Sequence, residues 1–257
     1  MRLAFSELGA GGETIIILHG LFGSRRNWAA IARKLAVNNR VLTLDLPNHG
    51  ASSWTGSVSY ELLSKSISDF IIEHELKDAT VLGHSMGGKV AMTLALTQPD
   101  LIKRLIVADI APVEYHHDNF SVITALEGVD LKSIKTRSDA DKHLMEKISE
   151  PMMRLFLLQN LVHSEDQYKW RINIPVIKKG LPSLHGFPSF SENIFFNGPT
   201  LFLAGARSDF IEPNHHKNIA HLFPKSSIIN IAGAGHWIHA DNPEAFVDAV
   251  FQFIRSS

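Results

Sequence analysis

The stretch Ala79-Thr80-Val81-Leu82-Gly83-His84-Ser85-Met86-Gly87 leads from a short apolar run into a helical pattern at residues 90–96. A Gly-x-Ser-x-Gly turn between a strand and a helix is typical of the nucleophile elbow. The serine of such a turn is strained, and the flanking glycines let neighbouring backbone pass where a Cβ atom would clash. The pattern therefore predicts that the Ser85 hydroxyl projects toward a substrate and is a candidate nucleophile.

Short apolar runs recur on both sides of this turn and alternate with longer amphipathic segments. They occupy residues 14–18, 41–44, 80–82, 105–108, 200–203 and 227–231. This rhythm predicts an α/β fold with a mostly parallel central sheet and crossover helices on both faces. Helical spacing of the apolar residues within 62–71 and 243–254 predicts two of those helices.

The rhythm is interrupted between residues 112 and 190, where helical patterns dominate and no good strand is predicted. An insertion of this length indicates a helical cap over the carboxyl ends of the strands, the edge at which open α/β sheets bind ligands. We expect residues 1–111 and 191–257 to form the core and residues 112–190 the cap. One set of apolar side chains in the cap could line a substrate pocket or simply form the hydrophobic core of the cap. This set is Met152, Met153, Leu155, Phe156 and Leu158.

The composition excludes several classes of partner. The 257 residues carry a formal net charge of −1 without a long run of like charges, which argues against nucleic acid and membrane surfaces. The apolar stretches are too short to span a bilayer, and the first residues lack a sustained apolar signal. Because there is no cysteine, a thiol nucleophile is excluded, and a cytoplasmic location is expected.

The segment His19-Gly20-Leu21-Phe22-Gly23 directly follows the run 14–18. In the fold that carries the nucleophile elbow, a loop at this place supplies one donor of the oxyanion hole. Loss of one such donor typically costs about 3–4 kcal/mol of transition-state stabilisation. We predict that the backbone N–H groups of Leu21 and Met86 form this hole and that Phe22 lines the substrate pocket.

A candidate general base lies near the carboxyl end, in Gly233-Ala234-Gly235-His236-Trp237. A loop there would carry His236 back over Ser85, and the order serine first, histidine last matches this fold. His236 and His239 also have a spacing that metal ligands use, but no third ligand stands at a recognisable zinc spacing nearby. We therefore expect neither a metal nor a cofactor.

Two aspartates are candidates for the acid that orients the base. Asp209 follows the run 200–203, in a loop where many hydrolases of this fold place their acid. There the acid stands three residues after the glycine, which is the position of Ser208, so Asp209 is one residue out of register. Asp109 ends the run 105–108 as an apolar-flanked carboxylate, and we favour it, although an aspartate also caps helices and turns readily.

Together these segments resemble the small α/β-hydrolase esterases of the YbfF type and their animal relatives in the abhydrolase-domain group. The matching motifs are HGLFGS at 19–24, DLPNHGASS at 45–53, GHSMGGK at 83–89, DIAPV at 109–113, WRINIP at 170–175 and AGAGHWIHA at 232–240. The resemblance implies an acid in the DIAP segment, which supports Asp109, and carboxylesterase activity without a cofactor. The resemblance also implies acyl-CoA thioesterase activity. We expect a small-molecule acyl ester or thioester as the substrate and a monomer or homodimer as the assembly.

Other functions remain open on the same residues. Carbon–carbon bond hydrolysis and peptidase activity use the same triad, and a ligand-binding protein could retain the hydrolase shell without catalysis. Dehalogenase and epoxide-hydrolase chemistry is disfavoured, because it normally needs an aspartate nucleophile at position 85.

Overall fold

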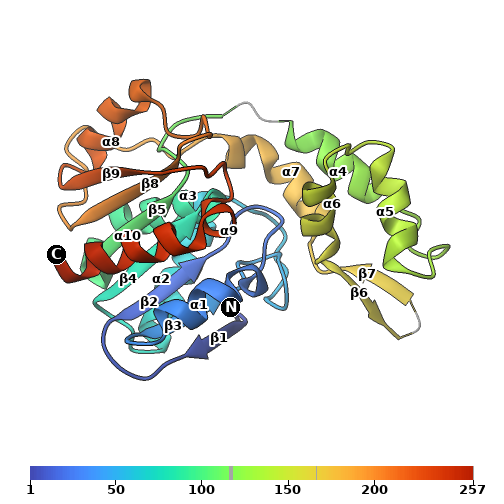
Figure 1. Cartoon of the computed structure of the whole chain (residues 1–257), viewed down its shortest axis with the longest axis horizontal. Coiled ribbons are helices and arrows are strands. Elements are labelled where there is room, and N and C mark those ends of the chain that lie inside the picture. Colours follow the sequence, from blue (N-terminus) through green and yellow to red (C-terminus); the bar gives the residue numbers. More distant parts are fainter. Residues whose placement is uncertain (116–117, 166, 257) are drawn as a thin grey trace.

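The computed structural model describes residues 1–115, 118–165 and 167–256, and its main sheet has the strand order β1-β3-β2-β4-β5-β8-β9 (Figure 1). The strands are β1 (Phe5–Leu8), β2 (Thr14–Leu18), β3 (Arg40–Leu44), β4 (Ala79–His84), β5 (Ile102–Ala108), β8 (Thr200–Gly205) and β9 (Ser226–Ile231). β1 pairs antiparallel with β3, and the other neighbours pair in parallel. The predicted α/β fold with a mostly parallel sheet is confirmed.

The six predicted runs are all strands of this sheet, from β2 to β9. The sequence patterns missed β1, in which every residue is exposed. An edge strand without a buried face shows no alternation of apolar and polar residues, and its backbone pairing with β3 leaves no local signal.

Helices pack on both faces of the sheet. Ile16 and Leu18 of β2 lie in a core cluster with α2 (Tyr60–Glu73) and α3 (Met86–Thr97). Ile15 and Ile17 point the other way, into a cluster with α1 (Ala29–Leu35) and α10 (Pro243–Ser256). Since β2 is therefore covered on both sides, it reads as a continuous apolar run. The remaining elements of the core are η1 (Arg25–Trp28), η2 (Pro99–Leu101), η3 (Pro213–His215), α8 (His216–Leu222) and α9 (Ile238–Asp241).

Between β5 and β8 the chain leaves the sheet and forms what we call the α4–α7 segment, residues 119–185, on the right of Figure 1. It has a hydrophobic cluster largely of its own. Its elements are α4 (Asn119–Glu127), α5 (Arg137–Met145), α6 (Pro151–Leu158), β6 (Leu161–Ser164), β7 (Gln167–Trp170) and α7 (Ile174–His185). The division into a core (1–111, 191–257) and a cap (112–190) stays a prediction.

The expectation that this region lacks strands is wrong, because β6 and β7 form an antiparallel two-stranded sheet. Only Leu161 and Trp170, at one end of the pair, are buried, and the other side chains with a described placement are at least partly exposed. Strands this short and polar give no apolar run, so helical patterns around them dominated the prediction.

The parallel strands bring distant segments to one edge of the sheet. The residues that follow β2, β3, β4, β5 and β8 are His19, Asp45, Ser85, Asp109 and Ala206. Because neighbouring parallel strands end at the same edge, the fold itself gathers these positions, and all of them except Ala206 carry polar side chains. Along the described parts of the chain, no helix combines the length and apolar character needed to cross a membrane.

Close backbone approach at this edge explains the need for glycine at position 87. A Cβ atom there would lie 2.5 Å from the carbonyl oxygens of both Leu18 and His19. We expect Gly87→Ala to lower the free energy of unfolding by about 1–3 kcal/mol, since backbone must shift to admit the methyl group. Gly11→Ala is the matched control, because a Cβ there meets nothing within 4 Å. Equal unfolding midpoints of both variants in urea would contradict this account.

Candidate active site

Ser85 stands at the sharp turn from β4 into α3, with φ 53° and ψ −120°. Positive φ is uncommon for a residue with a side chain, so the turn is strained. The Ser85 N–H donates to Ala108 O at 3.0 Å, which attaches the turn to β5. A Cβ atom at Gly83 would lie 2.1 Å from Gly87 O. The flanking glycines are therefore required by close backbone contact across the turn.

The loop after β9 carries His236 to this serine. His236 Nε2 lies 3.0 Å from Ser85 Oγ, and His236 Nδ1 lies 2.8 Å from Asp109 Oδ2. An ionised carboxylate only accepts, so Nδ1 carries the proton and Nε2 is left to accept from the serine hydroxyl. The structure thus brings together Ser85, His236 and Asp109, which lie far apart in the sequence.

Asp109 is fully buried at the end of β5 and has φ 53°. Its Oδ1 accepts from Gly205 N at 2.7 Å, and its Oδ2 accepts from Ser208 Oγ as well as from His236. The competing candidate, Asp209, is exposed to solvent. The carboxylate that accepts from the imidazole is therefore the one that the register argument favoured.

Two side chains that the sequence patterns did not single out position the imidazole. The Phe210 ring stacks on the His236 ring with centroids 3.9 Å apart and an interplanar angle of 18°. His84 Nε2 donates to the His236 backbone carbonyl at 2.8 Å, which fixes the backbone that carries the ring. The x position of the Gly-x-Ser-x-Gly turn was the available signal for His84. For Phe210, the local sequence offered none.

The predicted oxyanion donors lie in the pocket beside Ser85. Met86 is the first residue of α3, so its N–H has no acceptor within the helix. The Gly20 carbonyl accepts from His19 Nδ1 at 2.8 Å and from Gly23 N at 3.0 Å. Because a trans peptide points its N–H opposite to its carbonyl, these two bonds also fix the direction of the Leu21 N–H.

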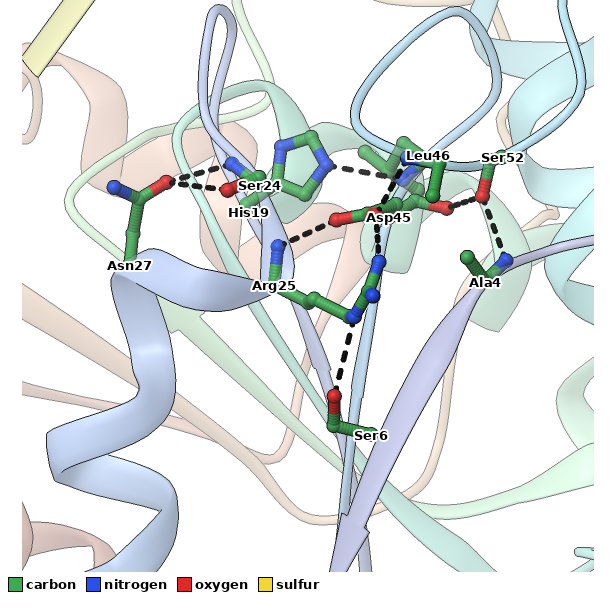
Figure 2. Close-up of polar contacts among 10 residues, drawn as sticks. Ala4, Ser6, His19, Ser24, Arg25, Asn27, Asp45, Leu46 and Ser52 are labelled. Carbon is green, nitrogen blue, oxygen red and sulfur yellow. Dashed lines mark hydrogen bonds and ion pairs between the residues drawn. The ribbon is translucent and has the colours of Figure 1, made fainter. Parts of the chain in front are cut away.

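This loop is fixed to the end of β3, as Figure 2 shows. His19 Nε2 accepts from Leu46 N at 3.0 Å, which leaves the proton on Nδ1 for Gly20 O. The buried Asp45 carboxylate accepts from Arg25 N at 2.7 Å and pairs with the Arg25 guanidinium. The Asp45 carbonyl accepts from Ser52 Oγ at 2.5 Å. The start of the DLPNHG motif therefore holds the loop that contains Leu21 in place.

A cavity of about 380 Å³ opens over Ser85 and extends under the α4–α7 segment. Phe22 lines it, as expected from the sequence, together with Met153 and Phe156 of α6. The other members of the apolar set in α6 point elsewhere: Met152 and Leu155 are exposed, and Leu158 lies in the cluster of the α4–α7 segment.

Lys89 borders the same cavity and joins the nucleophile helix to the α4–α7 segment. Its ammonium donates to the carbonyls of His185 and Gly186 at 2.9 and 2.6 Å, and Tyr60 Oη donates to Leu184 O at 2.6 Å. Burial lowers the pKa of Lys89 to about 7. Core side chains thus donate to carbonyls at the end of α7, where helix carbonyls lack partners within the helix.

The segments matched by the resemblance also meet in space. Asn173 of WRINIP donates through its backbone N–H and its Nδ2 to Asn48 of DLPNHG, both at 2.9 Å.

His239 stacks on Trp28 with ring centroids 4.1 Å apart. Within the described residues, no group of three or more His, Cys, Asp or Glu side chains could hold a metal ion.

Comparison with known proteins identifies the class. A family model described as the α/β hydrolase fold matches residues 13–243, and the chain belongs to that family. It is 39% identical over 248 residues to "sn-1-specific diacylglycerol lipase ABHD11" of Mus musculus, covering 93% of this chain and 80% of that protein.

Esterases are among the further relatives. "Esterase YbfF" of Escherichia coli (strain K12) is 32% identical over 244 residues, covering 94% of this chain and 92% of that protein. A solved structure described as "Marine microorganism esterase" has a TM-score of 0.94 at 37% identity, covering 98% and 99% of the two chains. The resemblance to YbfF-type esterases and abhydrolase-domain relatives is confirmed, and these relatives support the expectation of a carboxylic ester hydrolase.

Four buried histidines around the site make the fold sensitive to acid. Burial lowers the pKa of His49 and His239 to about 3 and lowers the pKa values of His19 and His84 as well. Between pH about 3 and 6.5 these histidines are protonated in the unfolded chain but neutral in the folded chain. The free energy of unfolding therefore falls as the pH drops below 6.5. Each such histidine contributes up to about 1.4 kcal/mol per pH unit.

We therefore expect urea unfolding to give a lower free energy of unfolding at pH 5.5 than at pH 7.5. In His239→Phe, which keeps a ring on Trp28, this loss should be smaller by about 1 kcal/mol because one titrating group is gone. A free energy that stays constant over this pH range, or an unchanged loss in the variant, would show that these side chains are not held neutral.

Proposed function

We propose that the chain is a serine carboxylesterase in which Ser85, His236 and Asp109 form the catalytic triad. The observation that carries the proposal is the continuous hydrogen-bonded arrangement from Ser85 Oγ through His236 to Asp109, at 3.0 and 2.8 Å. His236 takes the serine proton, and Ser85 attacks the acyl carbonyl. Asp109 holds the imidazole in the required tautomer and stabilises its protonated form.

The oxyanion of the tetrahedral intermediate lies between the Leu21 and Met86 N–H groups. The hydrogen bonds to Gly20 O orient the first and the start of α3 orients the second before substrate arrives. His236 then protonates the leaving group, an acyl-enzyme remains on Ser85, and water activated by His236 releases the acid. The donors are backbone groups, so the chemistry depends on loop geometry more than on the side chains of Leu21 and Met86.

The cavity favours a small ester as substrate. Its volume of about 380 Å³ lies within the usual range of small-molecule sites, roughly 300–1,000 Å³. Phe22, Met153 and Phe156 offer apolar surface suited to an acyl chain. We propose small acyl esters as substrates, and acyl-CoA thioesters as a second substrate class. We further propose that the protein is a monomer or homodimer in the cytoplasm. Turnover of p-nitrophenyl esters beside acyl-CoAs distinguishes the two leaving groups.

Ser85→Ala should lower kcat for p-nitrophenyl butyrate by at least about 1,000-fold, because the covalent step is lost. The same change should abolish labelling by a fluorophosphonate probe, while circular dichroism shows a retained fold. A wild-type chain that the probe fails to label would instead favour a ligand-binding protein with a hydrolase shell. Undiminished turnover in the variant would rule out the serine mechanism.

The two candidate acids should differ sharply in a paired comparison. In Asp109→Asn the amide oxygen can still accept from Gly205 N, which places the NH2 donor against His236 Nδ1, and we expect kcat to fall about 1,000- to 10,000-fold through the wrong tautomer. Asp209→Asn changes an exposed side chain, and we expect kcat within about two-fold of wild type. Steady-state kinetics on one chromogenic ester measures both, and a larger loss in Asp209→Asn would reverse the assignment.

A further inference from the structure

The loop between β2 and η1 contains a buried carbonyl whose donor comes from the α4–α7 segment. Phe22 O accepts from Asn160 Nδ2 at 2.7 Å, and both residues are buried. Asn160 stands between the end of α6 and the start of β6, 138 residues further along the chain. A buried carbonyl without a partner is costly, so this contact constrains the loop strongly.

The side chain of the same loop residue is held by the same segment. Although Phe22 follows β2 of the main sheet, its ring lies in the hydrophobic cluster of the α4–α7 segment. Its φ of 61° is uncommon for a residue with a side chain. Such a conformation persists only where the surroundings enforce it. The α4–α7 segment therefore fixes a strained residue of the loop through both its ring and its carbonyl.

A chain of hydrogen bonds connects Asn160 to the predicted oxyanion donor. The Phe22–Gly23 peptide accepts from Asn160 through its carbonyl. The Gly23 N–H on its other side donates to Gly20 O at 3.0 Å. The peptide that accepts this bond carries the Leu21 N–H opposite to its carbonyl, because the peptide is trans. Consecutive hydrogen bonds also polarise one another, so each accepted bond strengthens the next donor.

We propose that Asn160 is a positioning residue for the oxyanion hole, acting through the Phe22–Gly23 peptide. The inference rests on the proposed function and extends it to the α4–α7 segment. Asn160 is not one of the residues that line the cavity, so it acts on the reaction through the loop. Without its donor, the φ of Phe22 relaxes and the Leu21 N–H turns away from the place where the oxyanion forms.

The role is tested by Asn160→Leu, which keeps the approximate volume of the side chain and removes the donor. Loss of a whole oxyanion donor costs about 100- to 1,000-fold in kcat, and a misdirected donor should cost less. We expect kcat for p-nitrophenyl butyrate to fall roughly ten- to 100-fold. KM should stay within about two-fold, because contacts to the bound substrate are unchanged.

Gln159→Ala is the matched control. Gln159 Oε1 accepts from Asn27 Nδ2 at 2.6 Å, so this variant also removes a hydrogen bond between the α4–α7 segment and the core. That pair is exposed and lies outside residues 20–23. We expect kcat within about two-fold of wild type, as for other changes of an exposed side chain. A loss as large as in Asn160→Leu would show that any weakened attachment of the segment lowers activity.

A transition-state analogue distinguishes positioning from a general distortion of the pocket. With an alkyl trifluoromethyl ketone, the Ser85 oxygen bonds to the carbonyl carbon, His236 takes the serine proton, and the carbonyl oxygen becomes an anion in the hole. The corresponding trifluoromethyl alcohol has a closely similar shape and forms no such anion. In Asn160→Leu the inhibition constant of the ketone should rise by the factor by which kcat/KM falls, and that of the alcohol should not change. Equal losses for both compounds would overturn the positioning role.

Asn160→Ala covers the case in which leucine is not accommodated, because it removes the donor without adding bulk. Wild-type kcat and ketone affinity in a variant that circular dichroism shows to be folded would overturn the inference and leave the triad standing. Failure of both variants to fold would assign Asn160 a purely structural role. A wild-type chain that the ketone does not inhibit would contradict the proposed function itself.

Discussion

The buried carboxylate of Asp109 is the interaction on which the arrangement of the site depends. A charge without solvent is tolerated only where donors surround it. The donors that Asp109 finds come from the end of β8, from the loop after it and from the loop that carries His236. Because each of these segments must reach one carboxylate, their relative positions are set before any substrate is bound.

The core provides the rigidity that this arrangement requires. Phe22, Ser85 and Asp109 all have positive φ, a conformation that costs of the order of 1–3 kcal/mol per residue. They persist because the strands before them are packed on both faces. The α4–α7 segment is attached to the same framework, since Asn160 Nδ2 donates to Phe22 O at 2.7 Å and Lys89 binds the end of α7. The cavity lining and the side chains of Ser85 and Asp109 are therefore held by one framework.

Much of the fold is readable from local patterns. The buried strands are short apolar runs between turns, and α2 and α10 show helical spacing, so each could be predicted from its own residues. Phe5–Leu8 and the pair Leu161–Ser164 with Gln167–Trp170 could not. These strands are exposed or polar and exist because another segment supplies the partner backbone, which no local window contains.

For the candidate site, the amino-acid pattern by itself determined the positions of the serine turn, the glycine-containing loop after β2 and the late histidine, because strained turns and glycine spacing leave a signature in residue type. Only the tertiary structure shows that the buried Asp109 accepts from His236 while Asp209 is exposed, that Ser208 donates to the same carboxylate, and that Phe210 stacks on the imidazole. The direction of a side chain at the end of a strand depends on the local backbone dihedral angles and on the segments that pack against it. Neither the dihedral angles nor these neighbours can be inferred from the order of residues alone.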